Sequence, residues 1–245
     1  MIEDIWTMIL KESKELLAQG GSRRSSRLGL LFTVGFPGVL LPAEIGRSWV
    51  ESSTALFVAI WFPLFMVISL IADSFAGERE RHTLETLLAS RLSDRAILFG
   101  KVAAAVAYGW GLTLVILLLG LVTVNLFHGH GKLLLYPAAT GFGAIGMSLL
   151  VTTLAAGAGV LVSLRAATVR QAAQTLSIGV SLLFFVPVVL AQALPIEWRR
   201  RILHALNAAQ GAEVLVIVAL VLIGLDVALL AIAAARFKRA RLSFG

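Results

Sequence analysis

The chain has 245 residues, of which 58% are hydrophobic and only 14% are charged, and its mean hydropathy is +0.91. A soluble domain of this length needs far more surface charge, so the composition excludes a soluble protein and indicates a membrane protein with several spans. The formal charge of +7 does not indicate nucleic-acid binding, because the basic residues stand at the ends of apolar runs and are not clustered with aromatic residues.

The N-terminal stretch 1–19 predicts an amphipathic helix at the membrane surface. Isoleucine, leucine and tryptophan recur there at helical spacing, with acidic and basic residues between them, as in helices that lie in the interface. The acidic start and the interrupted apolar run do not fit a cleaved signal peptide, so we expect this helix to remain in the mature protein.

Six apolar runs follow, and each predicts a transmembrane helix. Their bounds are 28–46, 53–73, 101–126, 135–164, 172–194 and 212–235. In the first run, the apolar residues 28–43 reach only about 24 Å at the helical rise. This span must therefore borrow flanking residues, or be kinked or unwound near its outer end, where Pro37 and Pro42 stand. Pro63 should kink the second span, and Pro187 lies inside the fifth.

The regions around the fourth and fifth spans carry further signals. The apolar stretch 133–164 is too long for one span, so we expect a lead-in helix on the outer side before it. Small residues in this stretch favour close helix packing. They are Gly141, Gly143, Gly146, Ala155 and Gly159. Residues 195–208 predict an outer amphipathic segment.

A charged segment at 77–92 interrupts the apolar pattern between the second and third runs. At 100° per residue, four leucines fall on one helical face, and polar residues fall largely on the other. The leucines are Leu84, Leu87, Leu88 and Leu92, and the polar residues are Arg79, His82, Glu85, Thr86 and Ser90. We predict a short amphipathic helix, followed by a break at which Ser93 caps the next helix. A solvated connector needs no leucine face, whereas a helix that docks in a partner's groove does.

This segment resembles the cytoplasmic signature of the ABC type-2 exporter permeases. The matching residues are Gly77-Glu78-Arg79-Glu80, Thr83-Leu84-Glu85, Leu87-Leu88, Ser90, and Gly100-Lys101 at the head of the next run. Two residues depart from the pattern: His82 stands where a small residue, often Gly, is common, and Arg91 stands where Pro is common. The resemblance implies an all-α membrane protein with six transmembrane helices in one permease domain, 1–245. It also implies an N-terminal interfacial helix and a cytoplasmic coupling helix at 77–92.

The resemblance further implies the membrane permease subunit of an ATP-driven exporter, which moves substrate outward by alternating access. A separate ATPase subunit, with its own ATP and Mg, would dock on the coupling helix, and we expect two copies of each subunit. The expected coupling residues are Glu78, Arg79, Glu80, Thr83, Leu84, Glu85, Leu87 and Leu88. A mechanical or regulatory role on the same fold stays open as an alternative. So does an ion-coupled secondary transporter, although we see neither several intramembrane charges nor an inverted repeat.

The sequence predicts no catalytic or metal site in this chain. Neither Gly100-Lys101 nor Gly131-Lys132 lies in a phosphate-binding loop, and the motifs of hydrolases and zinc proteases are missing. With no cysteine, thiol chemistry is excluded. His128 and His130 have no carboxylate or thiol nearby in the sequence, so we expect an ordinary polar loop there.

The basic residues predict the orientation of the chain in the cell (inner) membrane. With a cytoplasmic N-terminus, sixteen Lys and Arg fall in the inner segments and five in the outer ones. The five are Arg47, Lys132, Arg199, Arg200 and Arg201. This positive-inside bias places both termini and the charged segment in the cytoplasm.

Asp226 is the one carboxylate well inside a predicted span. An ionised side chain is costly there unless it is paired or faces water. Asp226 is therefore either a group that lines the pathway or senses ions, or a packing hydrogen bond or a neutral acid, and the pattern leaves both open.

Overall fold

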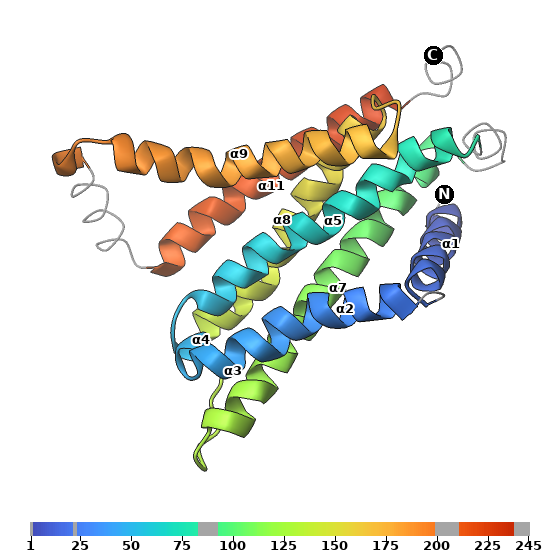
Figure 1. Ribbon diagram of the computed structural model, residues 1–245. Helices are drawn as coiled ribbons and strands as arrows, with labels where there is room; N and C mark the ends of the chain where they lie inside the picture. Colours follow the sequence, from blue (N-terminus) through green and yellow to red (C-terminus); the bar gives the residue numbers. More distant parts are fainter. Residues whose placement is uncertain (1, 22–23, 83–92, 199–210, 238–245) are drawn as a thin grey trace.

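The computed structural model describes residues 2–21, 24–82, 93–198 and 211–237, and the regular structure within them is helical. The helices labelled in Figure 1, together with the short π-helix η1, are α1 (Ile2–Gly21), α2 (Arg24–Gly35), η1 (Phe36–Leu40), α3 (Leu41–Ile45), α4 (Ser48–Glu51), α5 (Thr54–Glu80), α7 (Asp94–His128), α8 (Ala138–Ser163), α9 (Val169–Ala193) and α11 (Gly211–Arg236). The all-α class expected from the sequence is confirmed for these residues.

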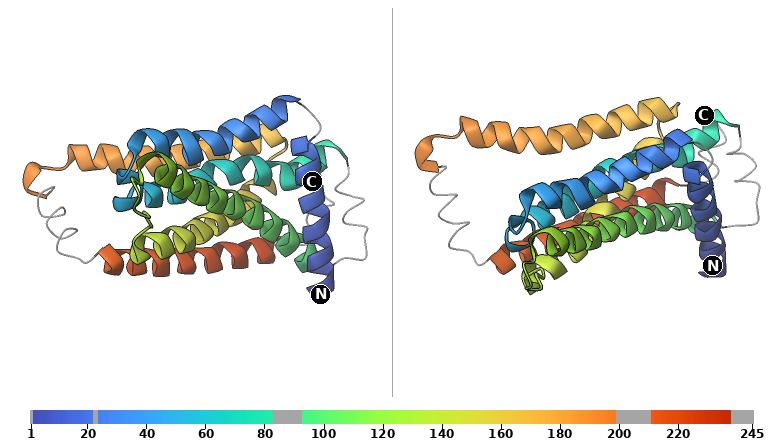
Figure 2. Two further views of the ribbon diagram at one scale, coloured as in Figure 1. Left: turned by 90° about the horizontal axis from the view of Figure 1, so that it is seen from below. Right: turned by 60° about the horizontal axis from the view of Figure 1, so that its bottom comes forward.

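Helix α1 lies across one end of the long helices (Figure 2), and α11 ends on the same side (Figure 1), where Phe237 lies beside Phe75 of α5. The same end holds the last turn of α5, the first turn of α7 and the turn between α8 and α9. We call it the α1 end. Every part of the charged segment that the structure describes lies there.

Five helices are long and apolar enough to cross a membrane: α5, α7, α8, α9 over Val169–Pro187, and α11 over Glu213–Arg236. The predicted first span contains a shorter apolar helix, Leu31–Ile45. That stretch belongs to a helical run that begins at Arg24 and takes π-helical form over Phe36–Leu40. Pro37 explains the change, since it has no N–H to donate within the helix. The run therefore borrows N-terminal residues and departs from α geometry, as expected.

The structure differs from the predictions at two boundaries. Gly77–Glu80 continue α5 and do not begin a new helix. The expected lead-in helix before α8 is wrong, because residues 133–137 are not helical. There the Asn125 side chain takes the place of helical hydrogen bonds: its amide donates to the Leu134 carbonyl (2.8 Å) and its oxygen accepts from the Leu134 N–H (2.7 Å). Most of the predicted outer segment 195–208 and residues 83–92 lie outside the described part of the chain.

Helices α5 and α8 share the largest interface in the described structure. Gly159 makes this approach possible, because a Cβ at that position would collide with Ile71. The Ser163 hydroxyl accepts from the backbone N–H groups of Phe75 and Ala76 and donates to the Ala72 carbonyl. The predicted packing role is confirmed for Gly159. It is wrong for Gly146, which has open space beside it.

Candidate functional site

A buried ionic cluster joins three helices at the α1 end. The Lys101 ammonium on α7 donates to Glu12 on α1 (2.8 Å) and to Glu78 on α5 (2.9 Å). The Lys101 side chain is only 2% exposed, and its nitrogen lies 5.5 Å from the centre of the Phe75 ring. A buried cation is tolerable only when it is paired and hydrogen-bonded. The cluster therefore fixes the positions of α1, α5 and α7 relative to one another.

The glycine before this lysine lets α1 come close. A Cβ on Gly100 would lie 2.6 Å from the Met8 Cβ and 2.7 Å from its Cγ, which is closer than real Cβ contacts. Met8 is fully buried against α7. The Gly100-Lys101 pair thus has two physical functions, close packing of α1 and charge pairing with α1.

Arg79, the next residue of the charged segment, binds the end of α8. Its guanidinium donates to the carbonyl of Ala166 (2.6 Å) and to that of Leu164 (3.1 Å). The last carbonyls of a helix have no partner within the helix, and a cation is favoured there by the helix dipole. Arg79 therefore caps α8 from the side of α5.

Glu80 binds the start of α9. Its carboxylate accepts from the backbone N–H of Val169 at 3.3 Å, and Val169 is the first residue of α9. Free N–H groups and the positive end of the dipole favour an acid at this place. Three consecutive residues, Glu78, Arg79 and Glu80, therefore each bind a different neighbour of α5.

The last residues before the undescribed part also have defined partners. Arg81 forms a salt bridge of 2.6 Å with Asp73, which lies about two helical turns earlier, on α5. His82 then takes a left-handed conformation with φ of 57°, and its N–H donates to the Arg79 carbonyl. A residue with positive φ after the end of a helix is most often glycine. On the other side of the gap, the Ser93 hydroxyl accepts from the Ala96 N–H, so the predicted cap of the third span is confirmed.

The structure thus brings together three of the eight expected coupling residues, namely Glu78, Arg79 and Glu80. The other five lie outside the described residues: Thr83, Leu84, Glu85, Leu87 and Leu88. Sequence reasoning missed the contribution of Glu12. The signal was present, because Glu12 falls on the same helical face as the apolar residues Ile5 and Met8. An acid on the apolar face of an interfacial helix indicates a buried partner.

Asp226 lies far from this cluster, in the middle of α11, and is buried with 6% of its surface exposed. Helix α11 packs mainly on α8: Leu215 contacts Gly143, and Leu229 contacts Gly157. Asp226 is therefore covered by the protein, on a helix that is otherwise mostly exposed. Asp226 is not among the residues that line the apolar cavity described in the next paragraph.

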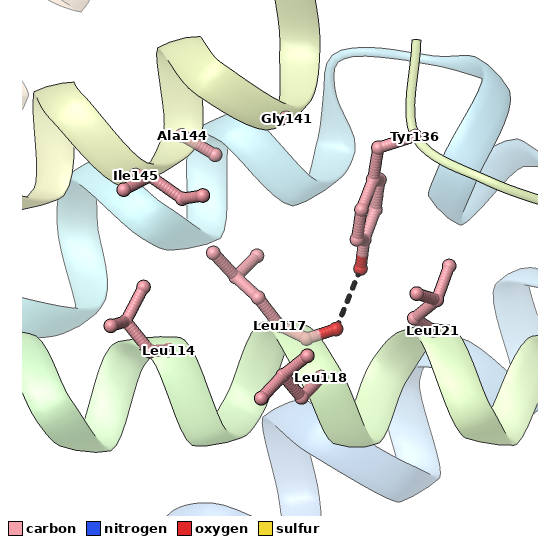
Figure 3. Close-up of a pocket in the computed structure, with 8 residues that line it drawn as sticks. All are labelled: Leu114, Leu117, Leu118, Leu121, Tyr136, Gly141, Ala144 and Ile145. Atoms are coloured by element: carbon pink, nitrogen blue, oxygen red, sulfur yellow. Dashed lines mark hydrogen bonds between the residues drawn. The ribbon is translucent and has the colours of Figure 1, made fainter. Parts of the chain in front are cut away.

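An apolar cavity of about 290 Å³ lies between α7 and the start of α8 (Figure 3). Its lining residues are Leu114, Leu117, Leu118, Leu121, Tyr136, Gly141, Ala144 and Ile145. The single phenol in this lining is already bonded, since it donates to the Leu117 carbonyl and accepts from Trp49 Nε1, both at 2.9 Å. Burial raises the pKa of Tyr136 and the Trp49 hydrogen bond lowers it. The cavity could therefore hold an apolar group, but its lining provides no free polar group for a hydrogen bond.

The helical fold, the five membrane-crossing helices and the charged cluster at one end define a multi-pass membrane protein of the transporter type. A family model described as "ABC-2 type transporter" matches residues 25–220, so the chain belongs to the ABC-2 type transporter family. Membership makes it the membrane subunit of an ABC transporter that works with a partner ATPase. Comparison with curated proteins gives no match.

Proposed function

We propose that this chain is the permease subunit of an ATP-driven exporter and that the Glu78-Arg79-Glu80 run carries the movement of the ATPase into the membrane helices. One observation supports this above all. Each of the three residues binds a different neighbour, namely Lys101, the end of α8 and the start of α9. A displacement applied to residues 83–92 would therefore move α1, α7, α8 and α9 together with α5.

The eight coupling residues divide by role in this proposal. Glu78, Arg79 and Glu80 position the end of α5, because their charges are already used inside the subunit. Thr83, Leu84, Glu85, Leu87 and Leu88 make the contact with the ATPase, with the leucines as apolar anchors on one helical face. In this assignment the coupling helix begins after the end of α5 at Glu80 and not at Gly77.

The topology in the proposal has six spans, with α2 to α3 as the first, and both termini in the cytoplasm. The described basic residues support the orientation, since Lys101, Arg79 and Arg236 all lie at the α1 end. Two copies of the chain with two ATPase subunits would provide the two sides of a substrate pathway. ATP hydrolysis is then the work of the partner alone.

Two variants of the charged segment test the docking model. Leu88→Asp places a carboxylate on the predicted apolar face, and Ser90→Asp places the same charge on the predicted polar face as a matched control. We expect Leu88→Asp to reduce the ATPase that co-purifies with the tagged chain at least tenfold, since an unpaired charge buried in a contact costs more than about 1.4 kcal/mol. Ser90→Asp should retain it.

Membrane insertion of both variants, measured as the amount of tagged chain in the membrane fraction, should equal that of the natural chain. Equal loss of ATPase in the two variants, or none in either, would contradict a leucine-face contact. A complex that stimulates ATP hydrolysis in proteoliposomes but releases no substrate outward would favour the mechanical or regulatory role.

A further inference from the structure

Asp226 is a buried acid without a described hydrogen-bond partner. It is 6% exposed, although its helix is otherwise poorly covered. Within the described residues, neither of its carboxyl oxygens has a hydrogen-bond partner. A carboxylate ion needs several donors when it leaves water. The position therefore suits the neutral form of the group.

The helix that covers Asp226 offers no charge. Leu215 contacts Gly143 and Leu229 contacts Gly157, a constant offset of 72 residues, which places Asp226 level with Leu154 of α8. Residues 138–163 contain no Asp, Glu, Lys, Arg or His. The α8 hydroxyls nearest this level, on Ser148, Thr152 and Thr153, donate to carbonyls of their own helix.

The charged residues on α11 itself and on α5 lie far from Asp226 along these helices. On α11 itself the charged residues are Glu213 and Arg236, about 20 Å and 15 Å from Asp226 at the helical rise. Helix α5 approaches α11 at Leu56, beside Gly143, and at Phe75, whose ring lies 5.2 Å from the ring of Phe237, the residue after α11. Residues 54–72 of α5 have no charge, and Asp73 is the first acid toward the α1 end.

We propose that Asp226 is a proton-binding site, which holds its proton as a carboxylic acid while α11 is packed on α8 and releases it only when α11 separates and water enters. The ligand is the proton itself. The same chemistry makes Asp226 a modification site for an apolar carbodiimide, because these reagents dissolve in the bilayer and react with protonated carboxyl groups. The proposal does not depend on the coupling function.

The reaction gives a direct reading of the protonated form. In dicyclohexylcarbodiimide, the acid proton passes to one nitrogen while a carboxyl oxygen bonds to the central carbon, which gives an O-acylisourea. The acyl group then shifts to the second nitrogen and leaves a stable N-acylurea. No atom is lost and nothing is oxidised, so the modified peptide gains the mass of one reagent molecule.

The experiment uses the full chain in its native membranes, treated with dicyclohexylcarbodiimide between pH 6 and pH 8 and followed by peptide mass spectrometry. We expect the adduct on Asp226 throughout this range and at least tenfold less on Glu213, a solvent-exposed acid on the same helix. Asp226→Asn should abolish the adduct, while Glu213→Gln should leave it unchanged. Labelling of Glu213 and not of Asp226 would overturn the proposal.

A stability series decides the question if the reagent gives no adduct. An unfolded chain releases an aspartate proton above about pH 4, whereas the proposed folded form keeps it. Rising pH should therefore lower the stability of the natural chain relative to Asp226→Asn. At pH 7.5 the Asn variant should melt at least about 2–4 °C higher than the natural chain. If the natural chain instead becomes more stable relative to the variant as pH rises, the carboxylate is ionised and paired, and the proposal is wrong.

Discussion

Lys101 is the residue on which the α1 end most depends, because its single ammonium group binds two acidic side chains. Removal of one member of a buried ionic group leaves the others unpaired and typically costs about 3–5 kcal/mol. The two acids come from different helices, Glu12 from α1 and Glu78 from α5. Without Lys101 they would repel each other across the interface that now joins these helices.

We therefore expect Lys101→Met to lower the free energy of unfolding by about 3–5 kcal/mol, measured by thermal or denaturant unfolding in detergent. Lys14→Met is the matched control, since Lys14 is an exposed lysine on α1, and it should change stability by less than about 0.5 kcal/mol. Equal stability of the two variants would show that the cluster does not hold the helices together.

His82 shows how a departure from a sequence pattern can be explained by the backbone. The resembled signature commonly has glycine at this position, and the structure gives it a left-handed φ of 57°. Histidine is among the residues that tolerate this region best after glycine, asparagine and aspartate. The chain keeps the backbone turn that ends α5 while placing a side chain where relatives of this type often have none.

At the scale of the element, the docking of α1 on α7 depends on Gly100, which has no side chain. A methyl group on Gly100 would overlap Met8, and overpacking of this kind costs about 1–3 kcal/mol. Gly100→Ala should therefore push α1 away from α7, lower the unfolding temperature and increase the rate at which trypsin cleaves α1.

Gly111→Ala is the control on the same helix, because nothing lies within 4 Å of a Cβ at Gly111. Alanine should gain up to about 1 kcal/mol of helix propensity there. If both variants prove equally stable and equally resistant to trypsin, the close approach of α1 is not required.

Apolar length and helical spacing predict most elements of this fold. The N-terminal helix, the five long apolar helices and the Ser93 cap follow from local patterns, and the described structure contains them. What local patterns do not contain is the pairing of distant residues. Glu12 and Lys101 are 89 positions apart, and no periodicity indicates that an acid on one helix meets a lysine on another.

The two helix boundaries that were predicted wrongly, at the end of α5 and before α8, also have non-local causes. Gly77–Glu80 read as the start of a polar helix because their charges contrast with the preceding apolar run. In the structure they extend α5, since Lys101, α8 and α9 supply partners for these charges. The stretch before α8 was expected to be helical from its apolar character, yet Asn125 binds its backbone from α7. Polar residues with partners elsewhere in the fold extend or end helices irrespective of local hydropathy.

At the scale of the whole molecule, the described subunit leaves much apolar surface uncovered. Helices α9 and α11 are the least buried of the five membrane-crossing helices, and large exposed side chains such as Phe185 and Leu220 lie along them. In a membrane protein, lipid or a further subunit covers such faces.

We predict that the detergent-purified complex contains two copies of this chain and two ATPase subunits. Native mass spectrometry would give the composition directly, and cross-linking of single-cysteine variants is straightforward in a chain that has no cysteine of its own. One copy bound to one ATPase as the stable species would rule out the symmetric assembly.

The position of Lys101 in the chain also sets the order in which the subunit can be built. Helix α1 leaves the ribosome first, but the residue that Glu12 binds is added 89 positions later. At about 5–20 residues per second, that interval is roughly 4–18 s. During this time the second span must be inserted, and Glu12 and then Glu78 lack the lysine that binds them in the folded subunit. Insertion of the third span delivers the ammonium between them, so α1 settles across the helix ends only after the span that follows the charged segment is in place.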